Sequence, residues 1–293
     1  MAPEISNVTV LGAGTMGRGI AHVAADAGYQ TRLYDTQQAA LEKAGATIRR
    51  NLAKGVELKK VDPAVAEAAL ANLRLLDNLS EAVEDTGLVI EAVPEDMALK
   101  IETFHAVAIH APDDALFASN TSALSITEMA AGSGRPDRFA GMHFFNPVHQ
   151  MKLIELVRGL QTSQQTLDAL TQVGRRMGKE MVLVNEAPGF VTSRINALIG
   201  NEAFRMLQEG VASAEDIDKA LKLGLNHPMG PFEMVDLVGL DVRLSILEFL
   251  HRTLGEAFRP NQILVQHVRA GRLGRKTGRG IYSYDEQGER VDR

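Results

Sequence analysis

Residues 12–17 read Gly-Ala-Gly-Thr-Met-Gly, a G-x-G-x-x-G pattern that is typical of dinucleotide-binding turns. Three glycines in six residues are common in loops, so the flanking residues matter. An apolar, β-branched run precedes the pattern at 8–11, and a helical pattern follows it. In that setting Gly12 makes a tight turn, Gly14 lets a pyrophosphate approach the backbone, and Gly17 lets the helix pack on the strand. The candidate cofactor-binding residues of this turn are Gly12, Ala13, Gly14, Thr15, Met16 and Gly17.

Asp35 ends the second expected strand, where an acidic residue is expected in a dinucleotide-binding βαβ unit. Its carboxylate can accept hydrogen bonds from both ribose hydroxyls and would repel a 2′-phosphate, which favours NAD over NADP as the cofactor. The alternative is a purely structural turn followed by an unrelated surface aspartate. The joint pattern of strand, glycine turn, helix and acidic residue favours dinucleotide binding.

A second group of residues could carry acid–base chemistry. Glu155 interrupts an otherwise apolar strand pattern, and a buried carboxylate is costly unless it is paired. His143 ends the neighbouring strand pattern and is a natural partner, because a carboxylate that orients an imidazole makes an effective general base. Ser122 could hydrogen-bond the same substrate oxygen. The alternatives are a structural histidine and a glutamate that faces water on an edge strand.

The overall composition excludes several other classes of function. The chain has 293 residues, no Cys and a net charge of -6, so disulfides, a thiol nucleophile and general nucleic-acid binding are not expected. No pair of histidines has metal-ligand spacing with a carboxylate, so we expect no metal. Neither a secretory segment nor a bilayer-length apolar run is present, which predicts a cytoplasmic protein that does not enter membranes.

The elements that must position these residues change character along the chain. Apolar strand patterns alternate with helical patterns up to about residue 185, which predicts a mostly parallel sheet covered on both faces. Beyond that point the patterns are helical only. We therefore predict an α/β, Rossmann-type NAD-binding domain over 1–186 and an all-α domain over 187–293. Strands are expected at 8–11, 31–34, 88–93, 115–119, 139–143, 153–157 and 181–184, and helices at 16–26, 37–53, 63–73, 100–109, 166–177, 190–208 and 261–269.

Basic residues gather along the second of these helical patterns and just beyond it, at Arg49, Arg50, Lys54, Lys59 and Lys60. A solvated helix face is the simplest interpretation. In an acidic protein, however, a local positive patch can also hold an anionic nucleotide tail.

Five motifs occur in order along the chain, and together they give it a resemblance to a known family. The motifs are residues 12–17, 119–122 (Ser-Asn-Thr-Ser), 143–147 (His-Phe-Phe-Asn-Pro), 188–191 (Pro-Gly-Phe-Val) and 274–278 (Gly-Arg-Lys-Thr-Gly). In this order the chain resembles the L-3-hydroxyacyl-CoA dehydrogenases, and among them the single-function bacterial 3-hydroxybutyryl-CoA dehydrogenases, over essentially its whole length.

The resemblance implies a substrate cleft between the domains and a homodimer formed through the C-terminal domain. It implies His143 as the catalytic base, Glu155 as its partner, and Ser122 as a contact of the reacting oxygen. Beside the glycine turn, the cofactor contacts that it implies are Asp35, Glu95, Lys100, Asn120, Ser122, Asn146 and Lys276. The substrate or CoA contacts that it implies are Asn51, Lys54, Lys59, Ser122 and Asn146.

Two positions depart from the pattern of the family. Leu58 stands where the family has a lysine toward CoA, although Lys54, Lys59 and Lys60 are near it in the sequence. Ser193 stands where the family often has an asparagine that contributes to the active site. Ser193 is therefore expected to keep that role in a weaker or water-mediated form, with Asn196 as an alternative source of the amide.

These observations predict NAD-dependent, reversible oxidation of a (3S)-3-hydroxyacyl-CoA, with 3-hydroxybutyryl-CoA as the expected short-chain substrate. Two alternatives stay open at this point. The first is a dehydrogenase of the same fold that acts on a free hydroxy acid, such as a sugar acid, and has no need of the basic helix. The second is a non-catalytic NAD-binding protein, against which the presence of Ser122, His143 and Glu155 together argues.

Overall fold

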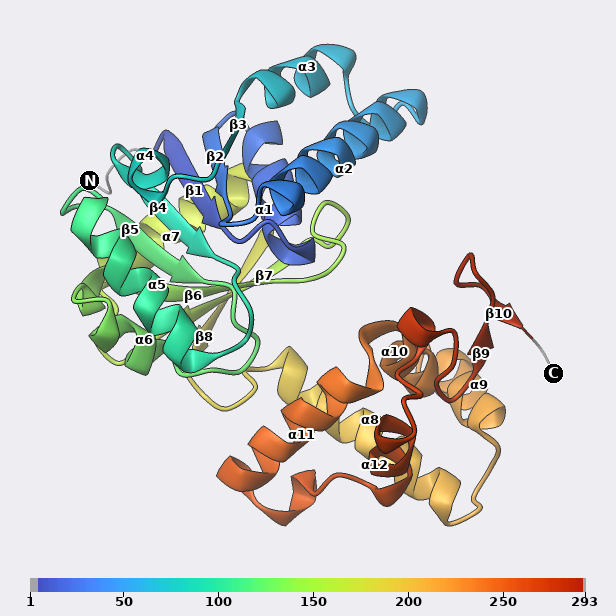
Figure 1. Ribbon diagram of the computed structural model, residues 1–293. Helices are drawn as coiled ribbons and strands as arrows, with labels where there is room; N and C mark the ends of the chain where they lie inside the picture. The colour runs from blue at the N-terminus through green and yellow to red at the C-terminus, as the bar shows by residue number, and fades with distance from the viewer. Residues whose placement is uncertain (1–4, 292–293) are drawn as a thin grey trace. The chain divides into compact units, whose positions relative to one another are not determined.

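The computed structural model describes residues 5–291, and the chain divides between Ala187 and Pro188 into two compact units (Figure 1). The first unit holds an eight-stranded sheet in the order β3-β2-β1-β4-β5-β6-β7-β8. Neighbouring strands run parallel except for β6 and β7, which are antiparallel. The strands are β1 (Asn7–Leu11), β2 (Gln30–Tyr34), β3 (Leu73–Leu76), β4 (Leu88–Glu91), β5 (Leu116–Ser119), β6 (Phe139–Phe144), β7 (Leu153–Arg158) and β8 (Glu180–Asn185).

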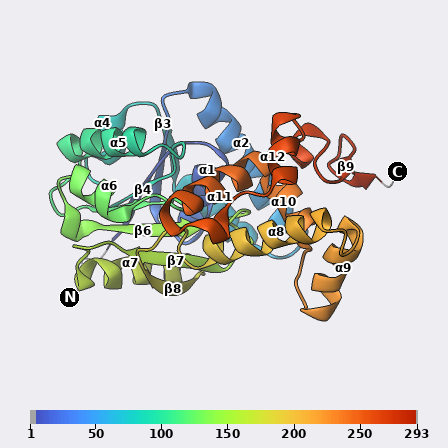
Figure 2. The same cartoon turned by 90° about the horizontal axis from the view of Figure 1, so that it is seen from below.

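Both faces of this sheet are covered, because its central strands are apolar on both sides. Alternate residues of each strand, such as Leu116 and Ala118 on β5, pack with α1 (Thr15–Asp26), α2 (Gln38–Glu57) and α7 (Gln164–Arg176). The residues between them face the other way, where Phe117 of β5 contacts Phe104 of α5 (Met97–His110). Helix α6 (Ile126–Gly132) lies beside α5, as Figures 1 and 2 show.

Strand order places a topological switch point at β1, since the chain moves outward to β2 and β3 and then returns to β4. In sheets of this kind ligands bind beyond the carboxyl ends of the strands at that point. The predicted doubly wound, mostly parallel α/β fold is therefore confirmed, and it brings the glycine turn and Asp35 to the expected edge.

One expected helix was too long, and some elements were not expected. The helix predicted over 63–73 ends at Ala71 as α3 (Pro63–Ala71), and Leu73 begins strand β3. Leu73 continued the helical spacing of the preceding residues, but its backbone pairs with β2 as an edge strand instead. Two short helices, α4 (Leu79–Val83) and α6, were also missed; each begins at a side-chain cap, Asn78 and Ser125 respectively.

The second unit is built mainly of helices around its own apolar core. Its helices are α8 (Thr192–Gln208), α9 (Ala214–Gly224), α10 (Pro231–Val238), α11 (Leu240–Leu254) and α12 (Gln262–Arg269). The prediction of a purely α domain needs one correction, because β9 (Ser283–Tyr284) and β10 (Arg290–Val291) form a small antiparallel pair. A buried carboxylate holds this segment: Asp236 accepts from the amides of Ile281 and Tyr282.

Within residues 5–291, none of the helices combines the length and the apolar character needed to span a bilayer. In the same part of the chain, His, Asp and Glu side chains do not gather in any group of three or more that could hold a metal ion.

Candidate active site

The glycine turn has the backbone geometry that its sequence predicts. Gly12 adopts a φ of +95°, and a Cβ atom there would lie 2.7 Å from the carbonyl oxygen of Ala92. A Cβ at Gly17 would collide with the carbonyl of Gly12, so the close packing of α1 on β1 also requires glycine. A Cβ at Gly14, in contrast, would meet nothing within 4 Å. The turn is therefore tight on its inner side and open on the side from which a phosphate would approach.

The amino end of α1 supplies the donors for such a phosphate. Gly14 is the N-cap, no acidic side chain lies in the first turn, and the first amide bonded within the helix is that of Arg18 to Gly14. The amides of the first helical turn, at residues 15–17, have no acceptor inside the helix and point outward from its positive end. This arrangement fits the pyrophosphate of a dinucleotide.

Asp35 lies beyond the end of β2 and is tied to the same turn. Its Oδ2 accepts from the amide of Ala13 at 2.7 Å, and its Oδ1 accepts from the amide of Gln37 at 2.9 Å. Each carboxylate oxygen has further lone pairs that can accept from ribose hydroxyls. Arg32, which lies on β2, forms an ion pair with Asp85. It does not line the cavity next to Asp35 that is described below.

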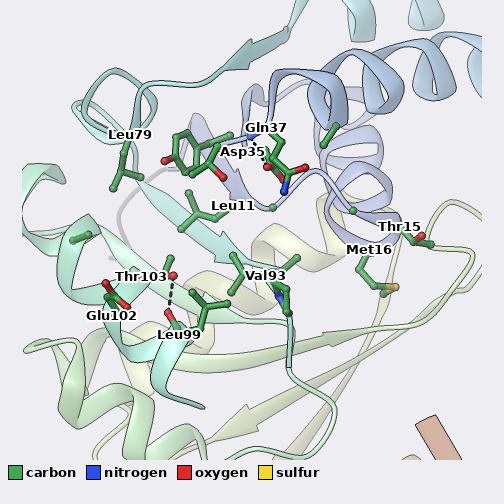
Figure 3. A pocket seen from close by; sticks show the side chains of 18 residues that line it. Leu11, Thr15, Met16, Asp35, Gln37, Leu79, Val93, Leu99, Glu102 and Thr103 are labelled. Atoms are coloured by element: carbon green, nitrogen blue, oxygen red, sulfur yellow. Dashed lines mark hydrogen bonds between the residues drawn. The ribbon is translucent and has the colours of Figure 1, made fainter. Parts of the chain in front are cut away.

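A cavity of about 700 Å³ joins these features. Figure 3 shows Asp35 and Gln37 on one side of it, Thr15 and Met16 at the start of α1, and Val93 beyond β4. Leu11, Ala92, Pro94 and Leu99 also line it. A volume of this size suits a nucleotide-sized ligand. NAD fits this combination of features: the glycine turn, the amino end of α1, the Asp35 carboxylate that can accept from a ribose, and the apolar walls.

His143 and Glu155 face each other across the antiparallel strands β6 and β7, as direct register partners. The His143 Nδ1 lies 2.8 Å from the Glu155 Oε2, and the two side chains are 6% and 1% exposed. The bond to a carboxylate makes Nδ1 the protonated nitrogen in the neutral ring, so proton exchange is assigned to Nε2. The phenyl ring of Phe145 lies against the imidazole, with ring centroids 4.5 Å apart.

Asn120 and Ser122 follow β5, the strand next to β6. The side-chain oxygen of Asn120 accepts from the amide of Phe144 at 2.9 Å, so Asn120 fastens the end of the strand that carries His143. The Ser122 amide donates to Glu95 Oε1 at 3.0 Å, and the Thr121 hydroxyl donates to the same oxygen at 2.5 Å. The first unit therefore brings Glu95, Asn120, Ser122 and His143 to one edge of the sheet.

Lys100 is buried at 1% exposure, which the sequence did not indicate. Its Nζ lies 2.6 Å from Glu91 Oε1 and 3.3 Å from Glu95 Oε2. The predicted cofactor contact of Lys100 stays a prediction, but its ammonium group is already engaged by two carboxylates. Glu91, the buried partner, was not singled out from the sequence, although it carries the signal that identified Glu155: a charge within an otherwise apolar strand pattern.

Asn51 of α2 and Asn146, beyond β6, line a second and smaller cavity of about 70 Å³. Arg18 of α1 lines it too and was also missed, although its position directly after Gly17 was visible in the sequence. Of residues 5–291, no carboxylate lies within ion-pair distance of Arg18. Lys54 and Lys59 are exposed and lie outside the residues that line this cavity, and Lys54 pairs with Glu57 at 2.9 Å.

Ser193 and Lys276 belong to the second unit. Ser193 lies in the first turn of α8, which begins at Thr192 rather than at the predicted residue 190, because Phe190 adopts a left-handed φ of 49°. Lys276 pairs with Asp241, with Nζ 2.6 Å from Oδ1. Their predicted contacts with substrate and cofactor stay predictions.

The fold and this edge of the sheet define an NAD-dependent dehydrogenase: the glycine turn fits the dinucleotide, and a buried imidazole–carboxylate pair stands at the neighbouring strands. Two family models then cover nearly the whole chain. The NAD-binding domain of 3-hydroxyacyl-CoA dehydrogenase matches residues 7–187, and the C-terminal domain of 3-hydroxyacyl-CoA dehydrogenase matches residues 189–284. The chain belongs to the 3-hydroxyacyl-CoA dehydrogenase family.

Individual relatives agree with this assignment. The chain is 45% identical over 285 residues to the "Probable 3-hydroxybutyryl-CoA dehydrogenase" of Bacillus subtilis (strain 168), covering 97% of this chain and 99% of the relative. It is 44% identical to the 3-hydroxybutyryl-CoA dehydrogenase of Bradyrhizobium diazoefficiens, with 97% of each covered. The crystal structure of the (S)-3-hydroxybutyryl-CoA dehydrogenase from Ralstonia eutropha matches with a TM-score of 0.92 at 42% identity, covering 97% of this chain and 100% of that one.

Proposed function

We propose that this enzyme interconverts (3S)-3-hydroxybutyryl-CoA and its 3-oxoacyl-CoA, with His143 as the general base. The observation that carries the proposal is the His143–Glu155 pair, 2.8 Å between Nδ1 and Oε2, at the same carboxyl edge as the dinucleotide cavity. The relatives named as 3-hydroxybutyryl-CoA dehydrogenases support a short acyl chain, and the similarity to the (S)-3-hydroxybutyryl-CoA dehydrogenase from Ralstonia eutropha supports the S configuration.

NAD, when bound, supplies the hydride acceptor, and the residues of the turn at 12–17 together with Asp35 would hold it. His143 takes the proton of the C3 hydroxyl at Nε2 as the hydride leaves C3, so the substrate loses one proton and one hydride. Glu155 stabilises the imidazolium that forms, and the Ser122 hydroxyl donates to the reacting oxygen. In the reverse direction the imidazolium returns the proton to the oxygen.

The CoA part of the substrate is assigned to the α2 side of the first unit. Asn51, Asn146 and Arg18 line one cavity, and Arg18 adds a positive charge with no carboxylate to neutralise it among residues 5–291. Lys54 and Lys59 contribute the weaker, exposed part of the positive charge. Binding energy from this remote tail helps to fix C3 for the reaction.

The homodimer is proposed to form through the second unit, which exposes large apolar side chains such as Leu223 and Leu225, 77% and 66% exposed. The cytoplasmic location stays a prediction from the sequence.

A chain-length series of 3-oxoacyl-CoA substrates, followed by the loss of NADH absorbance, tests the proposed reaction. Acetoacetyl-CoA should be reduced well, and chiral analysis of the product should give the S isomer. Free acetoacetate is the matched control: if it turned over as well as its thioester, the enzyme would be a hydroxy-acid dehydrogenase. His143→Gln should reduce kcat by about 10²–10⁴, the usual range for loss of a general base.

A further inference from the structure

Glu91 is the last residue of β4 and is fully buried, with 0% of its surface exposed. Its carboxylate accepts three hydrogen bonds. Oε1 accepts from the amide of Val93 at 2.7 Å and from Lys100 Nζ at 2.6 Å, and Oε2 accepts from the Ser119 hydroxyl at 2.6 Å. Burying a charge in this way is expensive, and a well-packed apolar residue would often serve the fold as well. The location of its partners suggests what the charge does.

One set of contacts leads from Glu91 to Ser122. Lys100 bonds to Glu91 and lies 3.3 Å from Glu95 Oε2, and Glu95 Oε1 accepts from the Ser122 amide. A second set is shorter: the Ser119 hydroxyl donates to Glu91 and accepts from the amide of Thr121 at 3.2 Å. Glu91 therefore holds the loop of residues 120–124 from two sides.

Another set of contacts leads from Glu91 to the wall of the cofactor cavity. The Val93 amide donates to Glu91, and the Val93 carbonyl accepts from Lys100 Nζ at 3.3 Å. Both backbone polar groups of Val93, which lines the cavity, are thus fixed by the same ion pair, and Figure 3 shows Val93 on that wall. One buried pair fastens a surface that faces the dinucleotide and a loop that carries Ser122.

We propose that Glu91 is a positioning residue for the dehydrogenase reaction, which through Lys100 and Ser119 keeps the Ser122 loop and the Val93 wall at a fixed separation. This role rests on the proposed contact of Ser122 with the substrate oxygen. Hydride transfer is sensitive to distance, so loss of this anchor lowers turnover more than it weakens cofactor binding.

Glu91→Gln tests the proposal, because glutamine keeps the size and one acceptor oxygen but loses the charge. The expected result is a folded protein whose kcat falls about 10–100-fold, the cost of a misplacement of about 1 Å, while its Kd for NADH rises much less. The Glu91→Gln and Lys100→Met double variant should lose little more than either single variant, because both act through one contact.

Asp218→Asn is the matched control. Asp218 is also a buried carboxylate, 1% exposed, and accepts from the amides of Phe232 and Glu233 and from the Tyr282 hydroxyl, but it lies in the second unit outside the proposed machinery. This variant should lower Tm while keeping kcat within about twofold, since it changes stability and not the positions of reacting groups. An equal loss of kcat in both variants would overturn the proposal.

Hydrogen exchange gives a readout that does not depend on activity. The Ser122 amide should exchange about tenfold faster in Glu91→Gln than in the wild type, and at an unchanged rate in Asp218→Asn. Unchanged exchange with unchanged kcat would show that Glu91 positions nothing.

If Glu91→Gln does not fold, Ser119→Ala is the second variant, because it removes one contact of the carboxylate. It should show the same changes in kcat and exchange in milder form, and its failure to do so would refute the proposal. Absence of wild-type turnover with acetoacetyl-CoA would refute the proposed function alone, since the exchange result stands apart from it.

Discussion

Replacing Glu155 by glutamine removes the charge beside His143 and keeps the shape of the side chain. The pair is almost completely buried, and Nδ1 lies 2.8 Å from Oε2. For charges about 4 Å apart at an effective dielectric constant of about 20, the attraction is about 4 kcal/mol. A general base acts from its uncharged form, so this attraction develops only as His143 takes the proton. It therefore contributes to kcat.

The amide oxygen of glutamine can still accept from Nδ1 and recovers about 1 kcal/mol as a neutral hydrogen bond. The remaining loss of about 3 kcal/mol corresponds to a reduction in kcat of about 10²-fold. The assay is steady-state oxidation of 3-hydroxybutyryl-CoA, with the Kd for NADH measured separately by fluorescence. The Kd should hardly change, because the pair lies outside the residues that line the dinucleotide cavity.

His143→Gln with Glu155→Gln completes a double-mutant cycle. Because the carboxylate acts on the imidazolium, the double variant should be no slower than His143→Gln alone. A Glu155→Gln enzyme that kept more than about a tenth of the wild-type kcat would refute the electrostatic argument.

Further predictions concern four other features. Asp35→Asn should narrow the preference for NADH over NADPH by about tenfold in kcat/KM, because the repulsion of a 2′-phosphate is lost; an unchanged ratio would leave Asp35 without that role. Ser193→Ala should cost about 1–3 kcal/mol in transition-state stabilisation, measured as kcat/KM, whereas Asn196→Ala should be silent; the reverse result would move the role along α8. Arg18→Gln should raise KM for acetoacetyl-CoA about tenfold at low salt but should have little effect on a 3′-dephospho-CoA thioester; a change in KM for NADH instead would assign Arg18 to the cofactor. Burial lowers the pKa of His22 to about 4, so the unfolded chain binds its proton first and about 3 kcal/mol of stability is lost as the pH falls from about 6.5 to 4; urea midpoints should show this in the wild type but not in His22→Asn.

The sequence predicted best what depends on local pattern. The G-x-G-x-x-G turn and the alternation of strands and helices each follow from residues close together in the chain, and the structure contains both. Leu73 shows the limit of such reasoning. Its spacing continued a helix, but the free edge of β2 made pairing as β3 the better solution, and no local pattern records that edge.

The candidate site was predictable to the same extent. The sequence indicated that His143 and Glu155 would pair because one lone charge in an apolar strand needs a partner nearby. Glu91 carried the same signal, but its partner Lys100 lies on helix α5, where the residues next to Lys100 in the sequence are exposed or half-buried. That a lysine there would be buried depends on how α5 packs against the end of β4, where Lys100 meets Glu91, and this is a property of the packed domain and not of any segment.

The two hydrogen bonds that Asp35 accepts from Ala13 and Gln37 also constrain how this enzyme can be redesigned. A change of cofactor to NADPH calls for removal of this carboxylate. The same two oxygens, however, tie the glycine turn to Gln37 at the start of α2. A single substitution that made room for the 2′-phosphate would therefore also loosen the glycine turn. That turn binds the pyrophosphate, which NAD and NADP have in common. A successful conversion needs a compensating acceptor for the Ala13 amide, and lineages that changed cofactor would have had to acquire both changes together or pass through a poorer enzyme.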